Sequence, residues 1–99
     1  MKLSEKDILD VLQDYFDLIK MLHLGGKPKK VELMEEEGEI DTDTVIVDGV
    51  RHEFSDIPHD DQMNTGRVLE IEELLCGGYG EISAAELQLR LMNKIQKEW

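Results

Sequence analysis

A β-hairpin is the feature of this sequence that most restricts its fold. The pair Asp48-Gly49 lies in the middle of a run rich in β-branched residues, Thr44–Phe54. An Asp-Gly pair suits the positive φ angles of a type I′ turn, so it fixes the register of the two strands that it joins. This register sets Val47 against Val50. The predicted core face consists of Val45, Val47, Val50, His52 and Phe54.

A third strand is predicted before this hairpin. Val31 and Leu33 alternate with polar residues, and Gly38 lies in an acidic turn. Ile40 has the opposite parity from Val45, so a bulge or break is expected near residues 41–43. The middle of the chain therefore predicts a three-stranded antiparallel sheet.

Helical patterns flank the predicted sheet. Ser4, followed by Asp7, is a capping signal for a first helix that ends before Gly25-Gly26. A second helix is expected from about residue 64 or 65, and Ser83 with Glu86 begins a third. The apolar positions of the first helix are Ile8, Val11, Leu12, Tyr15, Ile19 and Leu22, and those of the third are Leu87, Leu91, Ile95 and Trp99.

The order of these elements predicts a single α+β domain over residues 1–99. A chain of 99 residues has the length of one domain. The order α-β-β-β-α-α indicates helices packed on one face of a small antiparallel sheet. We find no resemblance to a known family across the chain.

The charge balance limits the classes of partner. The chain has 23 acidic and 11 basic residues and a net charge of −12 at pH 7. Such a chain repels nucleic acids and anionic membranes and attracts basic proteins. Residues 31–48 hold eight of the acids and no Lys or Arg. We expect neither direct nucleic-acid binding nor membrane binding.

The first candidate binding surface is a stripe of acids on the first helix. Steps of three and four residues place them on one side, which we expect to lie opposite the apolar face. Such a row of carboxylates can imitate phosphates, and proteins that inhibit nucleases often resemble this arrangement. The alternative interpretation is an ordinary solvated helix face. The stripe consists of Asp7, Asp10, Asp14 and Asp17.

The second candidate surface is the acidic block in the strands. Charges on edge strands discourage aggregation, which explains some of these acids but does not require so many without a base. A basic protein is the predicted partner, and a divalent cation is the alternative. The block contributes Glu32, Glu35, Glu36, Glu37, Glu39, Asp41 and Asp43 as predicted partner-binding residues.

The sequence predicts no catalytic residue, metal site or cofactor. Residues 78–87 resemble the second half of a calmodulin-type EF-hand loop, but the early ligand positions hold Leu75, Gly77 and Tyr79. His59, Asp60 and Asp61 are interpreted as a polar loop, with a metal or proton-transfer role as the alternative. We find no nucleophile elbow, phosphate loop or dinucleotide fingerprint, so the chain is predicted not to be an enzyme.

The predicted function is that of an acidic interaction protein in the cytoplasm. We expect an inhibitor of a basic nucleic-acid-handling protein, such as a nuclease, of the anti-defence or immunity type that includes phage anti-CRISPR proteins. Tyr79 and Trp99 are candidate apolar anchors. One alternative is a DNA-binding regulator that uses the last two helices. Another is an assembly protein that dimerises through Leu87, Leu89, Leu91, Met92 and Trp99. The single cysteine, Cys76, excludes an internal disulfide, and the sequence leaves monomer and homodimer open.

Overall fold

The computed structural model describes residues 3–22, 25–57, 62–76 and 82–99. It confirms the predicted α+β class and the order of the elements. They are helix α1 (Glu5–Met21), strands β1 (Val31–Glu36), β2 (Glu39–Val47) and β3 (Val50–Glu53), the 3-10 turn η1 (Phe54–Asp56), and helices α2 (Gln62–Cys76) and α3 (Ala84–Glu98).

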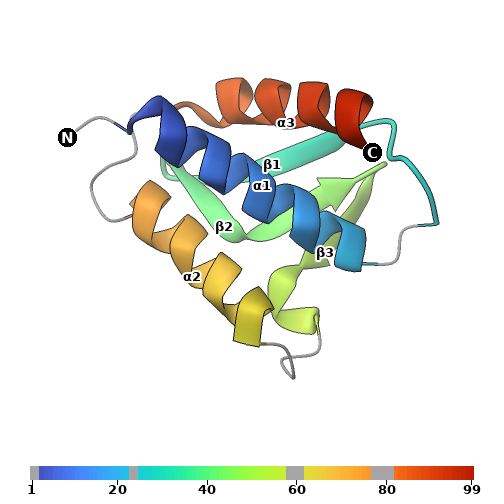
Figure 1. Ribbon diagram of the computed structural model, residues 1–99, viewed down its shortest axis with the longest axis horizontal. Helices are drawn as coiled ribbons and strands as arrows, with labels where there is room; N and C mark the ends of the chain where they lie inside the picture. The colour runs from blue at the N-terminus through green and yellow to red at the C-terminus, as the bar shows by residue number, and fades with distance from the viewer. Residues whose placement is uncertain (1–2, 23–24, 58–61, 77–81) are drawn as a thin grey trace.

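The helices cover one side of an antiparallel sheet whose strand order is β1-β2-β3. Helix α1 lies between α2 and α3 in front of the sheet (Figure 1). Helix α2 packs against α1 and β2, and α3 packs against α1 and β1. Side chains of α3 also bind the outer edge of β1, because Val31 N–H donates to Met92 Sδ and Leu33 N–H donates to Gln88 Oε1, both at 3.0 Å.

The hairpin between β2 and β3 has the predicted turn and register. Asp48 and Gly49 have φ angles of 49° and 83°, and Val47 pairs with Val50. Val45, Val47 and Phe54 are buried as predicted. The prediction is wrong for Val50, which is 56% exposed because it lies beside the turn at the start of a short edge strand.

The predicted irregularity in β2 is also present. Along β1 the pairing moves in one step from Leu33–Val45 to Met34–Asp41, so the intervening residues of β2 form a bulge. Asp41 holds this bulge: one carboxylate oxygen accepts from Asp43 N–H at 3.0 Å and the other from the Thr44 hydroxyl at 2.9 Å. The bulge resets the side-chain parity between the core part of β2 and its acidic end.

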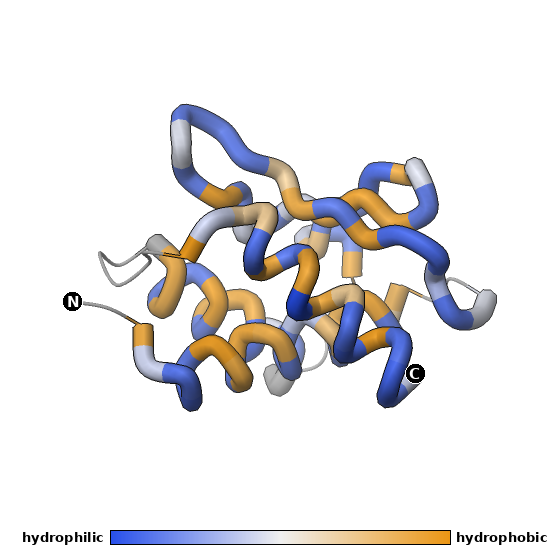
Figure 2. The backbone as a smooth tube through the Cα atoms, turned by 90° about the horizontal axis from the view of Figure 1, so that it is seen from above, coloured by the Kyte–Doolittle hydropathy of each residue, from blue (hydrophilic) through white to orange (hydrophobic). Residues whose placement is uncertain are grey.

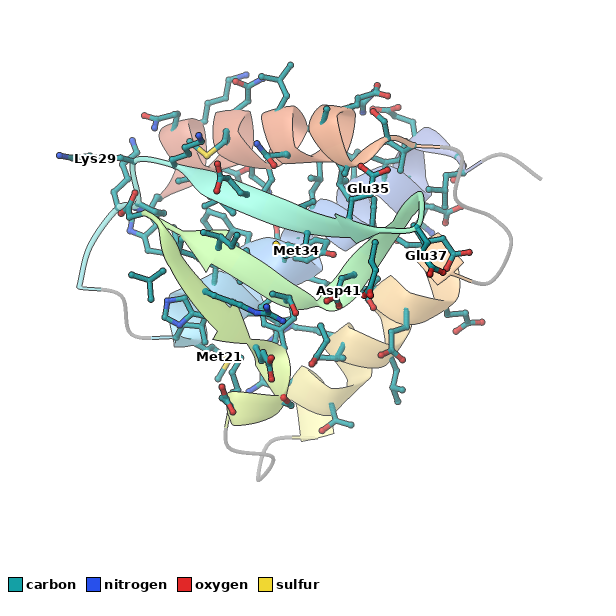
Figure 3. The ribbon with its side chains drawn as sticks, turned by 180° about the vertical axis from the view of Figure 1, so that it is seen from behind. Met21, Lys29, Met34, Glu35, Glu37 and Asp41 are labelled. Atoms are coloured by element: carbon teal, nitrogen blue, oxygen red, sulfur yellow. The ribbon has the colours of Figure 1, made fainter. Side chains whose placement is uncertain are left out.

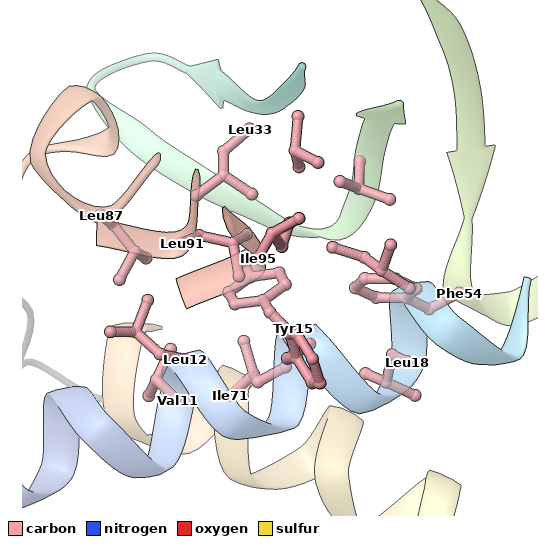
Figure 4. Packing of buried hydrophobic residues seen from close by; sticks show 14 of the residues in the cluster. Val11, Leu12, Tyr15, Leu18, Leu33, Phe54, Ile71, Leu87, Leu91 and Ile95 are labelled. Atoms are coloured by element: carbon pink, nitrogen blue, oxygen red, sulfur yellow. The ribbon is translucent and has the colours of Figure 1, made fainter. Parts of the chain in front are cut away.

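The core forms where the helices meet the covered face of the sheet (Figure 4). The predicted apolar positions of α1 and α3 point into it, and α2 adds Ile71. Both predicted N-caps are present: the Ser4 hydroxyl accepts from Asp7 N–H at 3.1 Å, and the Ser83 hydroxyl accepts from Glu86 N–H at 3.1 Å. These caps and the apolar spacing explain why the helices begin where they do.

Candidate functional site

The most prominent charged feature of the surface is the tip of the β1–β2 hairpin. We call Glu35, Glu36, Glu37 and Glu39 the acidic tip. All of these side chains are exposed, and none forms an ion pair with another residue in the described part of the chain. Strand pairing brings Glu36 and Glu39 opposite each other across the two-residue turn. The tip is therefore a concentrated negative surface without internal compensation.

The shape of this hairpin also favours contact with another molecule. Glu37 and Gly38 have φ angles of 53° and 81°, which is a second type I′ turn. In Figure 2 the hydrophilic β1–β2 hairpin lies on the sheet side of the molecule, away from the helices. Figure 3 looks onto the uncovered sheet face, with Met34 and Asp41 on it and Glu35 and Glu37 near the turn. A shallow polar depression at the tip is lined by Glu36, Glu37, Glu39, Ile40, Asp41 and Thr42.

The other acids of the predicted block have partners or different positions. Glu32 forms an ion pair with Lys30 at 2.8 Å, and Asp41 holds the bulge. Asp43 is half-buried and lines a crevice near α2. Asp48 accepts hydrogen bonds from the backbone N–H groups of Lys29 and Lys30 at 2.8 and 2.9 Å. Some acids of the predicted block are therefore candidates for binding a partner, whereas others stabilise the fold.

We expect Asp48→Ala to destabilise the protein without changing the acidic tip. The carboxylate is the acceptor for two backbone donors that precede β1, and alanine leaves both to water. The expected loss is about 1–2 kcal/mol in the free energy of unfolding, measured with urea. Asp48→Asn keeps an acceptor oxygen and, unlike alanine, tolerates the positive φ of 49° at this position, so it should lose less. Equal losses for the two variants would contradict this role.

The structure corrects the predicted acid stripe of α1. Asp14 is only 8% exposed, whereas the prediction placed it on a solvated face opposite the core. Asp17 pairs with Arg67 of α2 at 3.3 Å, and Asp7 accepts from Ser4 N–H at 3.3 Å in the capping box. Asp10 is half-buried. The error arose because α2 packs against a second side of α1, a contact that the periodicity of α1 alone does not reveal.

The environment of Asp14 favours its protonated form. Burial raises the pKa of Asp14 from 3.8 to about 8, and a hydrogen bond to Glu70 and the charges of Glu70 and Asp10 act in the same direction. Arg67 opposes them but does not outweigh them. Asp14 is thus largely neutral at pH 7, although the formal charge of −12 counts it as ionised. It belongs to the interface between two helices and adds little to the outer field.

The two alternative surfaces of the last helices differ from what the sequence predicted. Helix α1 lies between α2 and α3, so these two do not form a helix-turn-helix unit (Figure 1). Arg90 pairs with Glu5 at 2.6 Å and Glu86 at 3.3 Å, and Lys94 pairs with Glu98 at 2.6 Å. The basic charge of α3 is therefore largely neutralised by its neighbours.

The predicted dimer face is also mostly used inside the protein. Leu87 and Leu91 are in the core, and Trp99 packs edge-on against Phe16 with ring centroids 5.7 Å apart. Met92 is half-buried against β1. Leu89, at 62% exposure, is the member of this set that faces solvent. The wide apolar arc of α3 is explained by its contacts with both α1 and β1.

Three carboxylates of α2 were not singled out from the sequence. Glu70 contacts Asp14, while Glu72 and Glu73 are exposed, and Glu72 lines the same crevice as Asp43. These three acids are visible in the sequence. Which of them face β2 could not be predicted, because that depends on how the helices pack. Tyr79, His59, Asp60 and Asp61, and residues 78–81 of the EF-hand-like segment, lie outside the described residues.

Comparisons with known proteins add no functional assignment. No protein-family model, curated protein or solved structure matches the chain. Within the described ranges, no helix has the length and apolar character needed to cross a membrane. Among the same residues, no group of three or more His, Cys, Asp or Glu side chains is arranged to hold a metal ion.

Proposed function

We propose that this chain is a non-enzymatic interaction protein that binds a basic surface on a nucleic-acid-handling protein and inhibits it. The acidic tip makes the primary contact, and Asp41 and Asp43 extend that contact along β2. The partner is a cationic protein such as a nuclease, and the carboxylates take positions that phosphates occupy in its complex with nucleic acid.

The observation that carries this proposal is the uncompensated charge of the acidic tip. Its four carboxylates are exposed on one two-residue turn and its flanking strand ends. Neighbouring like charges repel, so they cost stability in the isolated protein. A cationic partner removes that repulsion and is attracted over about 10 Å at moderate ionic strength. Long-range attraction of this kind mainly accelerates association and selects for basic partners.

The structure of α1 changes which residues support the proposal. Asp14 is buried, and Asp7 and Asp17 have partners inside the chain. We therefore base the proposed contact on the hairpin and assign no part of it to the helix stripe. Trp99 is half-buried against Phe16 and is not needed as an anchor.

The test compares two variants of equal net charge. The tip variant carries Gln at positions 35, 36, 37 and 39, and the control variant carries Glu73→Gln, Glu86→Gln, Glu98→Gln and Asp56→Asn. Each change removes one negative charge, so both variants move from −12 to −8. Proteins captured from a cell lysate by the wild-type chain are identified by mass spectrometry, purified, and measured against all three chains.

The expected result is a loss of about 100-fold in affinity for the tip variant and little change for the control variant. Binding of the wild-type chain should weaken between about 50 mM and about 500 mM salt. Duplex DNA should compete with the chain for the partner, and the chain should inhibit the partner's activity on that DNA. Equal losses in both variants, or a captured partner that binds DNA and the chain simultaneously, would refute the proposal.

A further inference from the structure

A crevice between β2, η1 and α2 is not used by any part of the fold described above. Its walls are mostly apolar and include Leu18, Phe54, Ile57, Val68 and Leu69. Its volume is about 130 Å³. Pockets for drug-sized ligands measure about 300–1,000 Å³, whereas a cavity of about 150 Å³ holds a benzene ring. The crevice therefore has room for one side chain and not for a cofactor of nucleotide size.

A buried amide in the wall of this crevice has one polar atom that no described residue accepts from. Asn64 is 4% exposed, and its Oδ1 accepts from Arg67 Nη1 at 3.0 Å. Its Nδ2 is buried and donates to no atom of the described residues. A buried donor without an acceptor destabilises the folded state, so the polar part of this wall is not optimised for packing within the described chain.

The charges around the crevice indicate which kind of side chain it can bind. Asp43 of β2 and Glu72 of α2 both line it. Neither carboxylate forms an ion pair within the described part of the chain. An apolar channel with carboxylates in its walls suits an alkyl stem that ends in a cation, which is the structure of Arg and Lys.

The crevice also lies next to the acidic tip along β2. Asp41 and Thr42 line the polar depression at the tip, and the next residue, Asp43, lines the crevice. Adjacent residues are about 3.8 Å apart along the backbone, so one partner surface can reach both features. The bulge in β2 is the link between them.

We infer that this crevice is the anchor site for one arginine side chain of the basic partner. The alkyl stem lies against Phe54, Val68 and Leu69, and the guanidinium lies between Asp43 and Glu72. The inference rests on the proposed function, because it supplies a specific contact for the partner that the acidic tip attracts.

The test uses the isolated chain and a small probe. Nα-acetyl-arginine N-methylamide is titrated into the labelled protein, and amide shifts are followed by NMR. Saturable shifts are expected at Leu18, Phe54 and Leu69, with a Kd of about 1 mM. The citrulline analogue has the same shape without the charge and should bind at least about fivefold more weakly, because a charge-assisted pair is lost.

Matched variants test the assignment of the site. Thr65→Trp places a large ring in the crevice from an exposed position and should abolish the shifts. Glu72→Gln should weaken binding about threefold or more. Glu73→Gln, the neighbouring exposed acid outside the crevice, should leave the affinity unchanged.

Different results would contradict the cationic specificity and the position of the site. Equal affinity for the arginine and citrulline probes would overturn the cationic specificity. The assignment of the site would be wrong if the probe gave no saturable shifts or gave them elsewhere. It would also be wrong if Glu72→Gln and Glu73→Gln had equal effects. The acidic-tip variant keeps every residue that lines the crevice, so it should still give saturable shifts at Leu18, Phe54 and Leu69 even if its affinity for the cationic probe is somewhat lower. Failure of the probe test therefore does not decide the partner-affinity test of the proposed function.

Discussion

Asp14→Asn is expected to make the protein more stable, with a gain that grows as the pH rises. The folded state holds a proton on Asp14 up to a pKa of about 8, whereas the unfolded chain releases it near 3.8. The folded state therefore binds more protons between these values, and the free energy of unfolding falls as pH increases. Asparagine has the same shape as the protonated acid and carries no proton to lose, so it removes this decline.

The expected gain increases by about 2 kcal/mol between pH 5 and pH 8 and then levels off. This figure is below the full cost of ionising a buried acid, because Glu70 is exposed and can turn away into water. Urea unfolding of both proteins across this range measures the difference. Asp56→Asn removes an exposed carboxylate far from the cluster in sequence and should give a curve parallel to the wild type. A parallel curve for Asp14→Asn would contradict a neutral Asp14.

The burial of Asp14 could not be predicted from the sequence, whereas the fold class could. The fold class and element order followed from local signals, since the Asp48-Gly49 turn, the Ser4 cap and the α3 spacing each act within a few residues. The bulge was predictable because Ile40 and Val45 have opposite parity. The burial of Asp14 depends on where α2 docks, and no local pattern in α1 encodes that contact.

Only one of the two parts of the candidate site could be predicted from the sequence. The acidic tip could be located from the sequence, because a turn at Gly38 between polar strand ends must be exposed. The crevice could not be located, because it combines Asp43 of β2 with Asn64 and Glu72 of α2. The burial of Val50 was predicted wrongly for a related reason. Its pairing with Val47 was predicted correctly, but its position beside the turn leaves it 56% exposed.

Arg67→Met is expected to destabilise the protein by about 2–3 kcal/mol at pH 7. Arg67 pairs with Asp17 at 3.3 Å and donates to Asn64 Oδ1 at 3.0 Å, and it is the cation that lowers the pKa of Asp14. Methionine retains the apolar stem, so the loss reports the charge and the hydrogen bonds more than the packing. Lys30→Met removes an exposed cation that pairs with Glu32 and should cost much less.

The combination of Arg67→Met with Asp14→Asn shows whether the cluster acts as one unit. Near pH 6, Asp14 is protonated in the folded state, so its coupling to Arg67 should be small. Near pH 9, Asp14 is ionised and faces Arg67, so the coupling energy in the double-mutant cycle should rise by about 1 kcal/mol. A coupling that does not change with pH would mean that Arg67 acts only through Asp17 and Asn64. In that case Asp14 would not be the titrating group, and the interface between α1 and α2 would carry more negative charge at pH 7 than the burial of Asp14 implies.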